Sequence, residues 1–110
     1  MLEHPIDRFS SVQVWRESYQ RFWGESLPQE ALEVLERFCA LVGQDPDSMV
    51  NACLRPQGEG SRFLLSTRAR RRYIEQIDAF ERQEGSRERA NFVRSFFIHN
   101  GVAMNPPILR

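Results

Sequence analysis

A dense run of arginines is the part of this sequence best suited to chemistry, and that chemistry is the binding of an anion. Residues 61–74 hold five arginines and no acid, and from position 66 they read Ser-Thr-Arg-Ala-Arg-Arg-Arg. In a helix that turns about 100° per residue, three of them fall opposite the apolar side chains and project together into solvent. These are Arg68, Arg71 and Arg72. Because guanidiniums bind phosphate oxygens in a bidentate manner, the run predicts a phosphate-binding patch, with an ordinary solvated charge run as the alternative.

A second set of arginines follows after the Gly85-Ser86 step. Arg87, Arg89 and Arg94 lie in the segment that this step opens, together with Asn91, whose amide is suited to pairing with adenine. Since only this short turn separates the two sets, we expect them to lie close together and to contact double-stranded DNA. All 15 basic residues are arginine, which suits phosphate contacts, although a GC-rich genome would also favour arginine codons.

Enzymatic chemistry, by contrast, has no residues to support it. The two histidines, His4 and His99, lie in the terminal segments, and no serine or cysteine lies in a Gly-x-Ser-x-Gly context. Gly58-Glu59-Gly60 is not followed by the further glycine and the lysine that a Walker loop requires. Cys39 and Cys53 fall within apolar helical patterns, as expected for packed thiols in the cytoplasm. We therefore expect no catalytic residue, no metal site and no cofactor.

Apolar residues recur at three- and four-residue steps along most of the chain and predict an all-α bundle of four to five helices. The expected helices run over about 11–23, 26–42, 46–54, 66–84 and 86–100. Ser26, Asp45 and Ser86 are the expected N-terminal caps. Residues 55–60 predict a loop, and no stretch alternates with a period of two.

The expected division of the chain is a single helical domain with two short flanking segments. Residues 1–10 are an N-terminal extension, 11–101 the domain, and 102–110 an extended linker that leaves it. In the first helix, Phe22 is expected to share the buried stripe with Trp15. The net charge is zero, and the second helix carries an acidic face that we expect to lie far from the arginines. That face consists of Glu30, Glu33 and Glu36.

Several of these features together resemble a known family. They are Trp15, Tyr19, Phe38, the segment Asp45–Val50, the Gly85-Ser86 step, and the segment 93–102, which reads Val-Arg-Ser-Phe-Phe-Ile-His-Asn-Gly-Val. Over about residues 11–107, the chain is similar to the core-binding, SAM-like N-terminal domain of tyrosine recombinases, or phage-type integrases.

The resemblance implies an orthogonal SAM-like bundle that forms one jaw of a clamp around a DNA half-site. Catalysis in that family belongs to a second domain, so this chain would not itself be an enzyme. The implied partners are double-stranded DNA and the catalytic domain of the same parent protein. A monomer is expected in isolation, because members of the family assemble on DNA and through their catalytic domains.

A helical protein–protein interaction module is the alternative from another functional class. The two differ in their largest exposed patch, which is made of contiguous arginines in a DNA-binding domain and of contiguous apolar side chains in a protein-binding one. No apolar run approaches the roughly 18 residues that cross a bilayer, so a membrane is not an expected partner.

Overall fold

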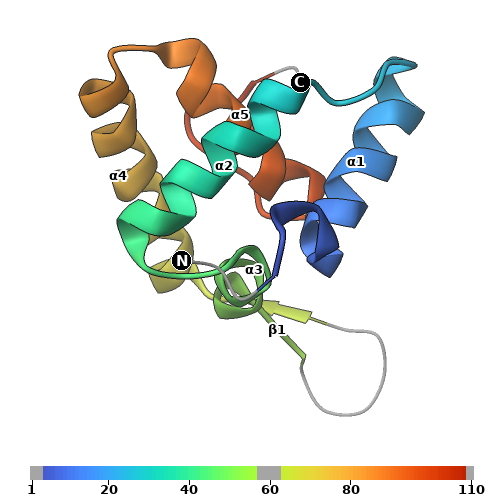
Figure 1. Cartoon of the computed structure of the whole chain (residues 1–110). Helices are drawn as coiled ribbons and strands as arrows, with labels where there is room; N and C mark the ends of the chain where they lie inside the picture. Colours follow the sequence, from blue (N-terminus) through green and yellow to red (C-terminus); the bar gives the residue numbers. More distant parts are fainter. Residues whose placement is uncertain (1–3, 57–62, 109–110) are drawn as a thin grey trace.

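The computed structural model describes residues 4–56 and 63–108, and these form a bundle of helices with one small β-ribbon (Figure 1). In chain order the elements are η1 (Ile6–Arg8), α1 (Ser10–Trp23), α2 (Gln29–Val42), α3 (Pro46–Cys53), β1 (Leu54–Pro56), β2 (Phe63–Leu65), α4 (Thr67–Glu84) and α5 (Arg87–His99). The predicted all-α class is therefore confirmed.

The helix ends follow mostly from local side-chain chemistry. Asp45 and Ser86 cap α3 and α5 as predicted, and Ser66 caps α4, since each side-chain oxygen accepts a hydrogen bond from the amide three residues on. The predicted cap at Ser26 is wrong. Helix α2 begins at Gln29, with Pro28 in the capping position and no side-chain hydrogen bond there.

The central helix of the bundle is α5, which packs against α1, α2 and α4. Its aromatic pair, Phe96 and Phe97, is fully buried, and the ring of Phe96 meets Trp15 of α1 edge-on at 5.5 Å. The indole of Trp15 donates to the hydroxyl of Ser95 at 3.0 Å, so its polar edge is also satisfied in the core. Phe22, expected in the same stripe as Trp15, is instead 71% exposed, although the next residue, Trp23, packs against the core.

The β-ribbon was not expected from the sequence. Its strands pair antiparallel, with Leu54 opposite Leu65 and Arg55 opposite Leu64. The amide of Ser66 extends the pairing by donating to the carbonyl of Cys53 at 2.7 Å. The predicted loop over 55–60 is therefore wrong where the structure describes it, and its remaining residues lie outside the described part of the chain.

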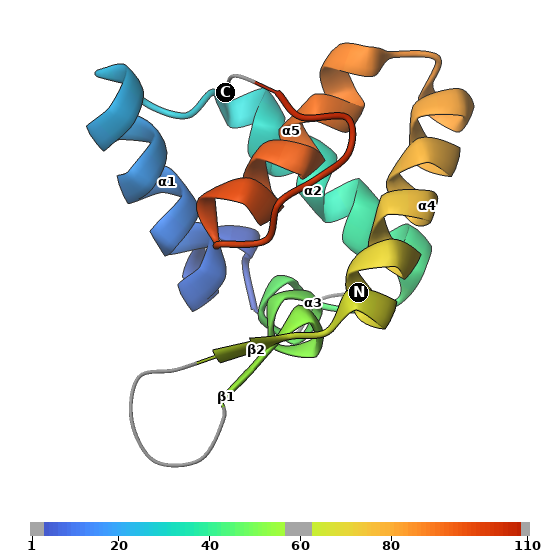
Figure 2. The same ribbon diagram turned by 180° about the vertical axis from the view of Figure 1, so that it is seen from behind.

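Both ends of the described chain pack onto the bundle, beyond the predicted bounds of 11–101. Ile6 and Phe9 belong to the core, as do Val102 and Met104. The carbonyl of Ala103 accepts a hydrogen bond from the guanidinium of Arg70 on α4 at 2.6 Å. Figure 2 shows the C-terminal segment turning back along α5. The expectation of a linker that leaves the domain from residue 102 is thus wrong up to Met104.

Candidate nucleic-acid interface

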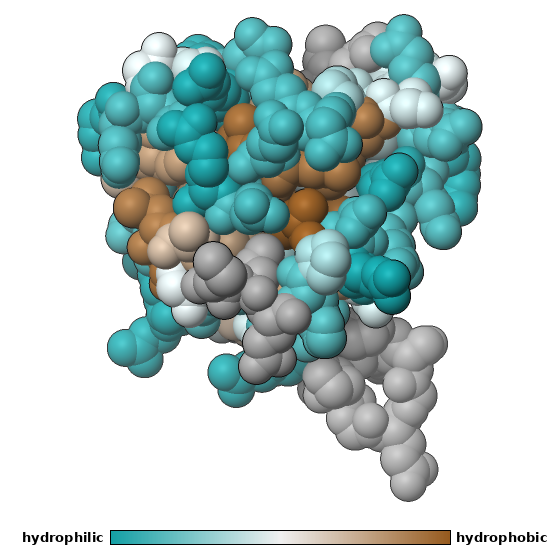
Figure 3. All heavy atoms as spheres, viewed as in Figure 1, coloured by the Kyte–Doolittle hydropathy of each residue, from teal (hydrophilic) through white to brown (hydrophobic). Residues whose placement is uncertain are grey.

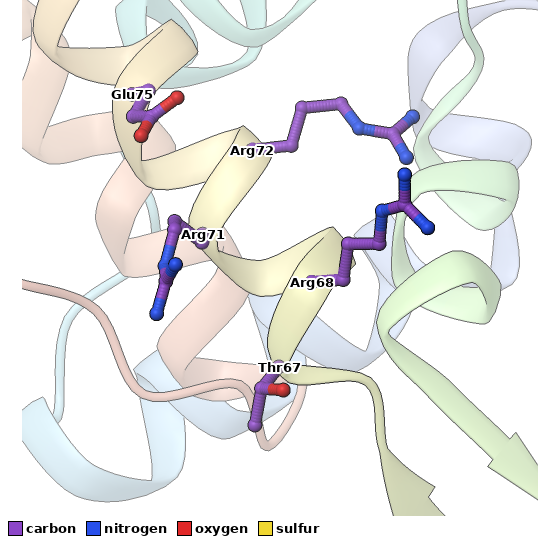
Figure 4. A pocket seen from close by; sticks show the side chains of 5 residues that line it. All are labelled: Thr67, Arg68, Arg71, Arg72 and Glu75. Atoms are coloured by element: carbon purple, nitrogen blue, oxygen red, sulfur yellow. The ribbon is translucent and has the colours of Figure 1, made fainter.

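Three exposed arginines lie in the first two turns of α4 and line an open hollow of about 310 Å³ (Figure 4). The hollow is lined by Thr67, Arg68, Arg71, Arg72 and Glu75. We call the arginines Arg68, Arg71 and Arg72 the free arginine patch. Their exposure confirms that they point away from the buried face of α4, which carries Ala69 and Tyr73.

The three side chains do not all point the same way. Figure 4 shows Arg68 and Arg72 extending to one side of α4 with their guanidiniums toward each other, while Arg71 extends to the other side. The prediction that all three project together is therefore correct only for the pair four residues apart. Two cations at this spacing destabilise a helix slightly, and an anion held between them would relieve that repulsion.

Within the described residues, no carboxylate pairs with any arginine of the free arginine patch. Glu75 lines the hollow, but no ion pair joins it to Arg71. At the helix start, the Ser66 hydroxyl accepts from the amide of Ala69 at 3.2 Å. The earlier amides of the first turn have no partner within the helix, so they add a partial positive charge that favours an anion.

Buried groups behind the patch do not supply reactive chemistry. Burial raises the pKa of the Cys53 thiol to about 11, although the nearby arginines Arg72 and Arg70 oppose that rise. Burial likewise raises the pKa of Cys39 to about 12. Both thiols are therefore protonated near neutral pH and inert as nucleophiles, which fits the expectation of packed cysteines.

Arg94 is the clearest correction to the predicted DNA contacts. It is 1% exposed and forms ion pairs with Asp78 at 3.0 Å and with Glu81 at 2.8 Å. Its guanidinium also donates to the side-chain oxygen of Asn91 at 2.9 Å. Because α5 is the central helix, a side chain that a simple helical wheel places outside is enclosed by α4. Arg94 cannot contact DNA in this structure, and the oxygen of Asn91 is already engaged.

The remaining arginines of the second set, the exposed Arg87 and the half-buried Arg89, each have a carboxylate partner. Arg89 pairs with Glu84 at 3.1 Å and lies 3.9 Å from Glu30, and Arg37 also pairs with Glu84, at 2.6 Å. Arg87 lies 3.4 Å from a carboxylate oxygen of Glu81. These ion pairs tie α2, α4 and α5 together around the hairpin turn. We call Arg37, Arg87, Arg89 and Arg94, with their acidic partners, the paired arginine cluster.

The two sets of arginines are not neighbours, contrary to the prediction. Helices α4 and α5 form an antiparallel hairpin, so the free arginine patch lies at one end of α4 and the α4–α5 turn at the other (Figure 2). Twelve residues of helix from Arg72 to Glu84 correspond to about 18 Å. The acidic face of α2 is correspondingly not remote from all arginines, since Glu30 approaches Arg89.

Sequence reasoning missed one cation that lies beside the free arginine patch. Arg55 is exposed on β1, directly opposite Leu64 of β2, and β2 leads into α4 through Ser66 alone. Its signal was hidden because the segment was interpreted as a loop.

A serine–histidine contact was also missed. The hydroxyl of Ser18 lies 2.7 Å from Nδ1 of His99, whose ring packs near Tyr19 and Phe22. The contact joins the middle of α1 to the end of α5, and its position between two packed helices indicates a structural role.

Other kinds of site are not evident among the described residues. No group of three or more histidine, cysteine, aspartate or glutamate side chains there could hold a metal ion. Among the same residues, no helix combines the length and apolar character needed to cross a membrane. Comparisons with protein-family models, curated proteins and solved structures find no match to this chain.

Proposed function

We propose that this chain is a DNA-binding domain that holds the phosphates of a duplex with the free arginine patch. The observation that carries the proposal is the contrast in pairing among the arginines. Within the described residues, Arg68, Arg71 and Arg72 have no carboxylate partner, whereas the members of the paired arginine cluster each have one. The exposed Arg82, in the last turn of α4, is the exception near the α4–α5 turn. Unpaired, exposed guanidiniums are available to an external anion without first breaking an internal ion pair.

Phosphate is the anion that this geometry favours. Arg68 and Arg72 extend toward each other from one face of α4, so one phosphate group can accept from both guanidiniums (Figure 4). The first-turn amides of the helix lie beside them and favour the same ligand. Because the hollow is open rather than enclosed, it suits a repeating chain of phosphates better than a small buried molecule.

The finer part of the proposal rests on resemblance. In a tyrosine recombinase or integrase, the corresponding domain clamps a DNA half-site, acts in the cytoplasm and works with a catalytic domain of the same protein. The order of helices in this chain is compatible with that role. We therefore propose a SAM-like core-binding domain as the class of DNA-binding module, with phosphate contacts restricted to one end of α4.

The test is a titration of labelled duplex DNA with the chain at several salt concentrations. Three phosphate contacts predict a log-log slope of about −3, and the affinity of a single module is expected to be micromolar at physiological salt. Replacing the whole free arginine patch by glutamine should remove most of the slope. Absence of binding at low salt, equal binding by the triple variant, or stronger binding to duplex RNA of the same sequence would each overturn the proposal.

A helical protein-interaction module is the second candidate, and one observation favours it. Helix α1 exposes Phe22 at 71% and Val14 at 45%. Figure 3 shows apolar atoms across the centre of one face, but hydrophilic side chains interrupt them. If sedimentation at high concentration showed a complex heavier than the 12.9 kDa chain, and Phe22→Ser abolished it, this candidate would move ahead.

A further inference from the structure

The β-ribbon has two unlike faces, and only one is used by the fold. Leu54 and Leu65 are opposite each other and share one face, and Leu54 packs partly buried against the core. Its Cδ1 lies 3.6 Å from the position that a Cβ on Gly101 would occupy, which places this face against the end of α5. Arg55 and Leu64 are opposite each other as well, so their side chains share the outer face.

The outer face is exposed and carries an unusual pair of side chains. Leu64 is 57% exposed and Arg55 is also exposed, and no ion pair joins Arg55 to a carboxylate within the described residues. A protruding apolar side chain beside a free guanidinium has no role in packing this domain. Figures 1 and 2 show the ribbon leaving the body of the molecule beside α3, next to the start of α4.

The ribbon is held in a fixed relation to the free arginine patch. Only Ser66 separates β2 from α4, and its amide is bound to the carbonyl of Cys53 at 2.7 Å while its hydroxyl caps the helix. From Leu64 to Arg68 the chain advances four residues, or at most about 14 Å even if fully extended. That distance is less than the distance between the two ends of α4.

We propose that the outer face of the β-ribbon is a second contact surface, which enters a groove of duplex DNA while the free arginine patch holds the adjacent phosphates. A two-stranded ribbon fits the major groove, where an arginine can pair with guanine and an apolar side chain can contact the methyl group of thymine. The charge supports DNA as the occupant, because the described parts of β1, β2 and the first two turns of α4 contain arginines but no acid. This inference rests on the proposed function and adds a contact that reads bases to one that positions the backbone.

The deciding experiment compares uncharged and acidic substitutions at the ribbon with matched ones far from it. Leu64→Ser should lower the affinity for duplex DNA by about three- to tenfold and leave the salt slope unchanged, since no phosphate contact is lost. Leu64→Glu should lower it further, because it brings a negative charge to the DNA. Phe22→Ser and Phe22→Glu are the controls, since Phe22 is exposed at the far end of α1 and should change affinity less than twofold.

The outcomes separate the two proposals. If the parent chain binds duplex with the expected slope, but both Leu64 variants bind like the Phe22 variants, the ribbon inference is overturned and the phosphate site stands. If the parent chain does not bind duplex, both fail. Circular dichroism of each variant checks that a loss of binding is not a loss of folding.

Discussion

The two ends of helix α4 carry arginines in opposite circumstances. At its start, the free arginine patch is exposed and lacks carboxylate partners within the described residues. At its end, the paired arginine cluster is bound to Glu81, Glu84 and Asp78, and one member is buried. Apart from the exposed Arg82, the described arginines near the end of α4 therefore join helices, whereas those of the free arginine patch are left available. Net charge cannot reveal this difference, because the chain as a whole is neutral.

The comparison also separates two kinds of interaction energy. A guanidinium enclosed with two carboxylates contributes to stability mainly through the cost of leaving those partners unpaired. An exposed guanidinium near a helix start contributes nothing favourable to folding and opposes the helix dipole. Retaining such residues is understandable if they bind something else. The predictions below test each side of this contrast, from the largest effect on stability to the smallest.

Replacement of the buried Arg94 should have the largest effect on stability. Arg94→Met keeps much of the volume but leaves Asp78 without its cation and leaves Glu81 with only the more distant Arg87, at 3.4 Å. The side chains of Asp78 and Glu81 are 44% and 24% exposed. Because these carboxylates can partly hydrate, we expect a loss of about 2–4 kcal/mol in the free energy of unfolding, measured with urea. The exposed Arg82→Met on the neighbouring helix α4 should cost no more than about 0.5 kcal/mol. Equal costs would show that the burial of Arg94 is incidental.

The pH dependence of stability should report the same network. The hydrogen bond from Arg94 holds the pKa of Glu81 below its ordinary value of 4.5. A lowered folded-state pKa adds stability that is present above about pH 4.5 and is lost as pH falls through the folded value. The parent chain should thus lose more stability between about pH 5 and pH 3 than Glu81→Gln does. If urea unfolding gave the same change in free energy of unfolding with pH for the parent chain and for Glu81→Gln, the role given to Glu81 would be contradicted.

The shared acid of the paired arginine cluster should produce coupling between its two cations. Glu84 is only 7% exposed and accepts from both Arg37 and Arg89, whose side chains are 54% and 41% exposed. Each single change to glutamine should cost about 0.5 kcal/mol or less, because solvent screens these pairs and the other cation remains. The double variant should exceed the sum by about 0.5–1 kcal/mol, as measured in a double-mutant cycle. Strict additivity would mean that the two pairs act independently.

The smallest effects should have opposite signs at the two ends of α4. Arg68→Gln removes a cation from the first turn and should raise the free energy of unfolding by a few tenths of a kcal/mol, in the absence of DNA. Arg82→Gln removes one from the last turn and should lower it by a similar amount. Thermal unfolding at low ionic strength measures both. A stabilising role for Arg68 would weaken the case that it serves a ligand.

The sequence predicted the parts of this structure that depend on local chemistry. Asp45 and Ser86 were correct as caps because a cap needs only its own side chain and the next turn. The ribbon was missed because strands of three residues carry too little alternation to recognise. Phe22 was misplaced because helical periodicity identifies an apolar stripe but not how much of that stripe the neighbouring elements cover.

The candidate site was predicted only in part, for a related reason. Whether an arginine is free depends on which acids other helices bring to it, as Glu30 of α2 is brought to Arg89 of α5. Arg94 was misassigned because α5 is buried on most of its circumference, so a polar residue there lies inside. The two arginine sets are separated because α4 and α5 form an antiparallel hairpin. Arg87 and Arg89 lie next to the turn of this hairpin, whereas the free arginine patch lies at the other end of α4.

The most direct test of the central claim removes the same number of positive charges near one end of α4 or near the other, in two separate variants. One variant carries glutamine at Arg68, Arg71 and Arg72, and the other carries it at Arg37, Arg87 and Arg89, so both lose the same net charge. Both are titrated against labelled duplex DNA at several salt concentrations. We expect the first variant to bind DNA at least about tenfold more weakly at low salt. The magnitude of its log-log salt slope should fall by about 2.7, at roughly 0.9 per phosphate. The second should stay within about twofold of the parent, because its arginines are already paired. Equal losses in both variants, or a larger loss in the second, would contradict the claim that the free arginine patch is the DNA-binding surface.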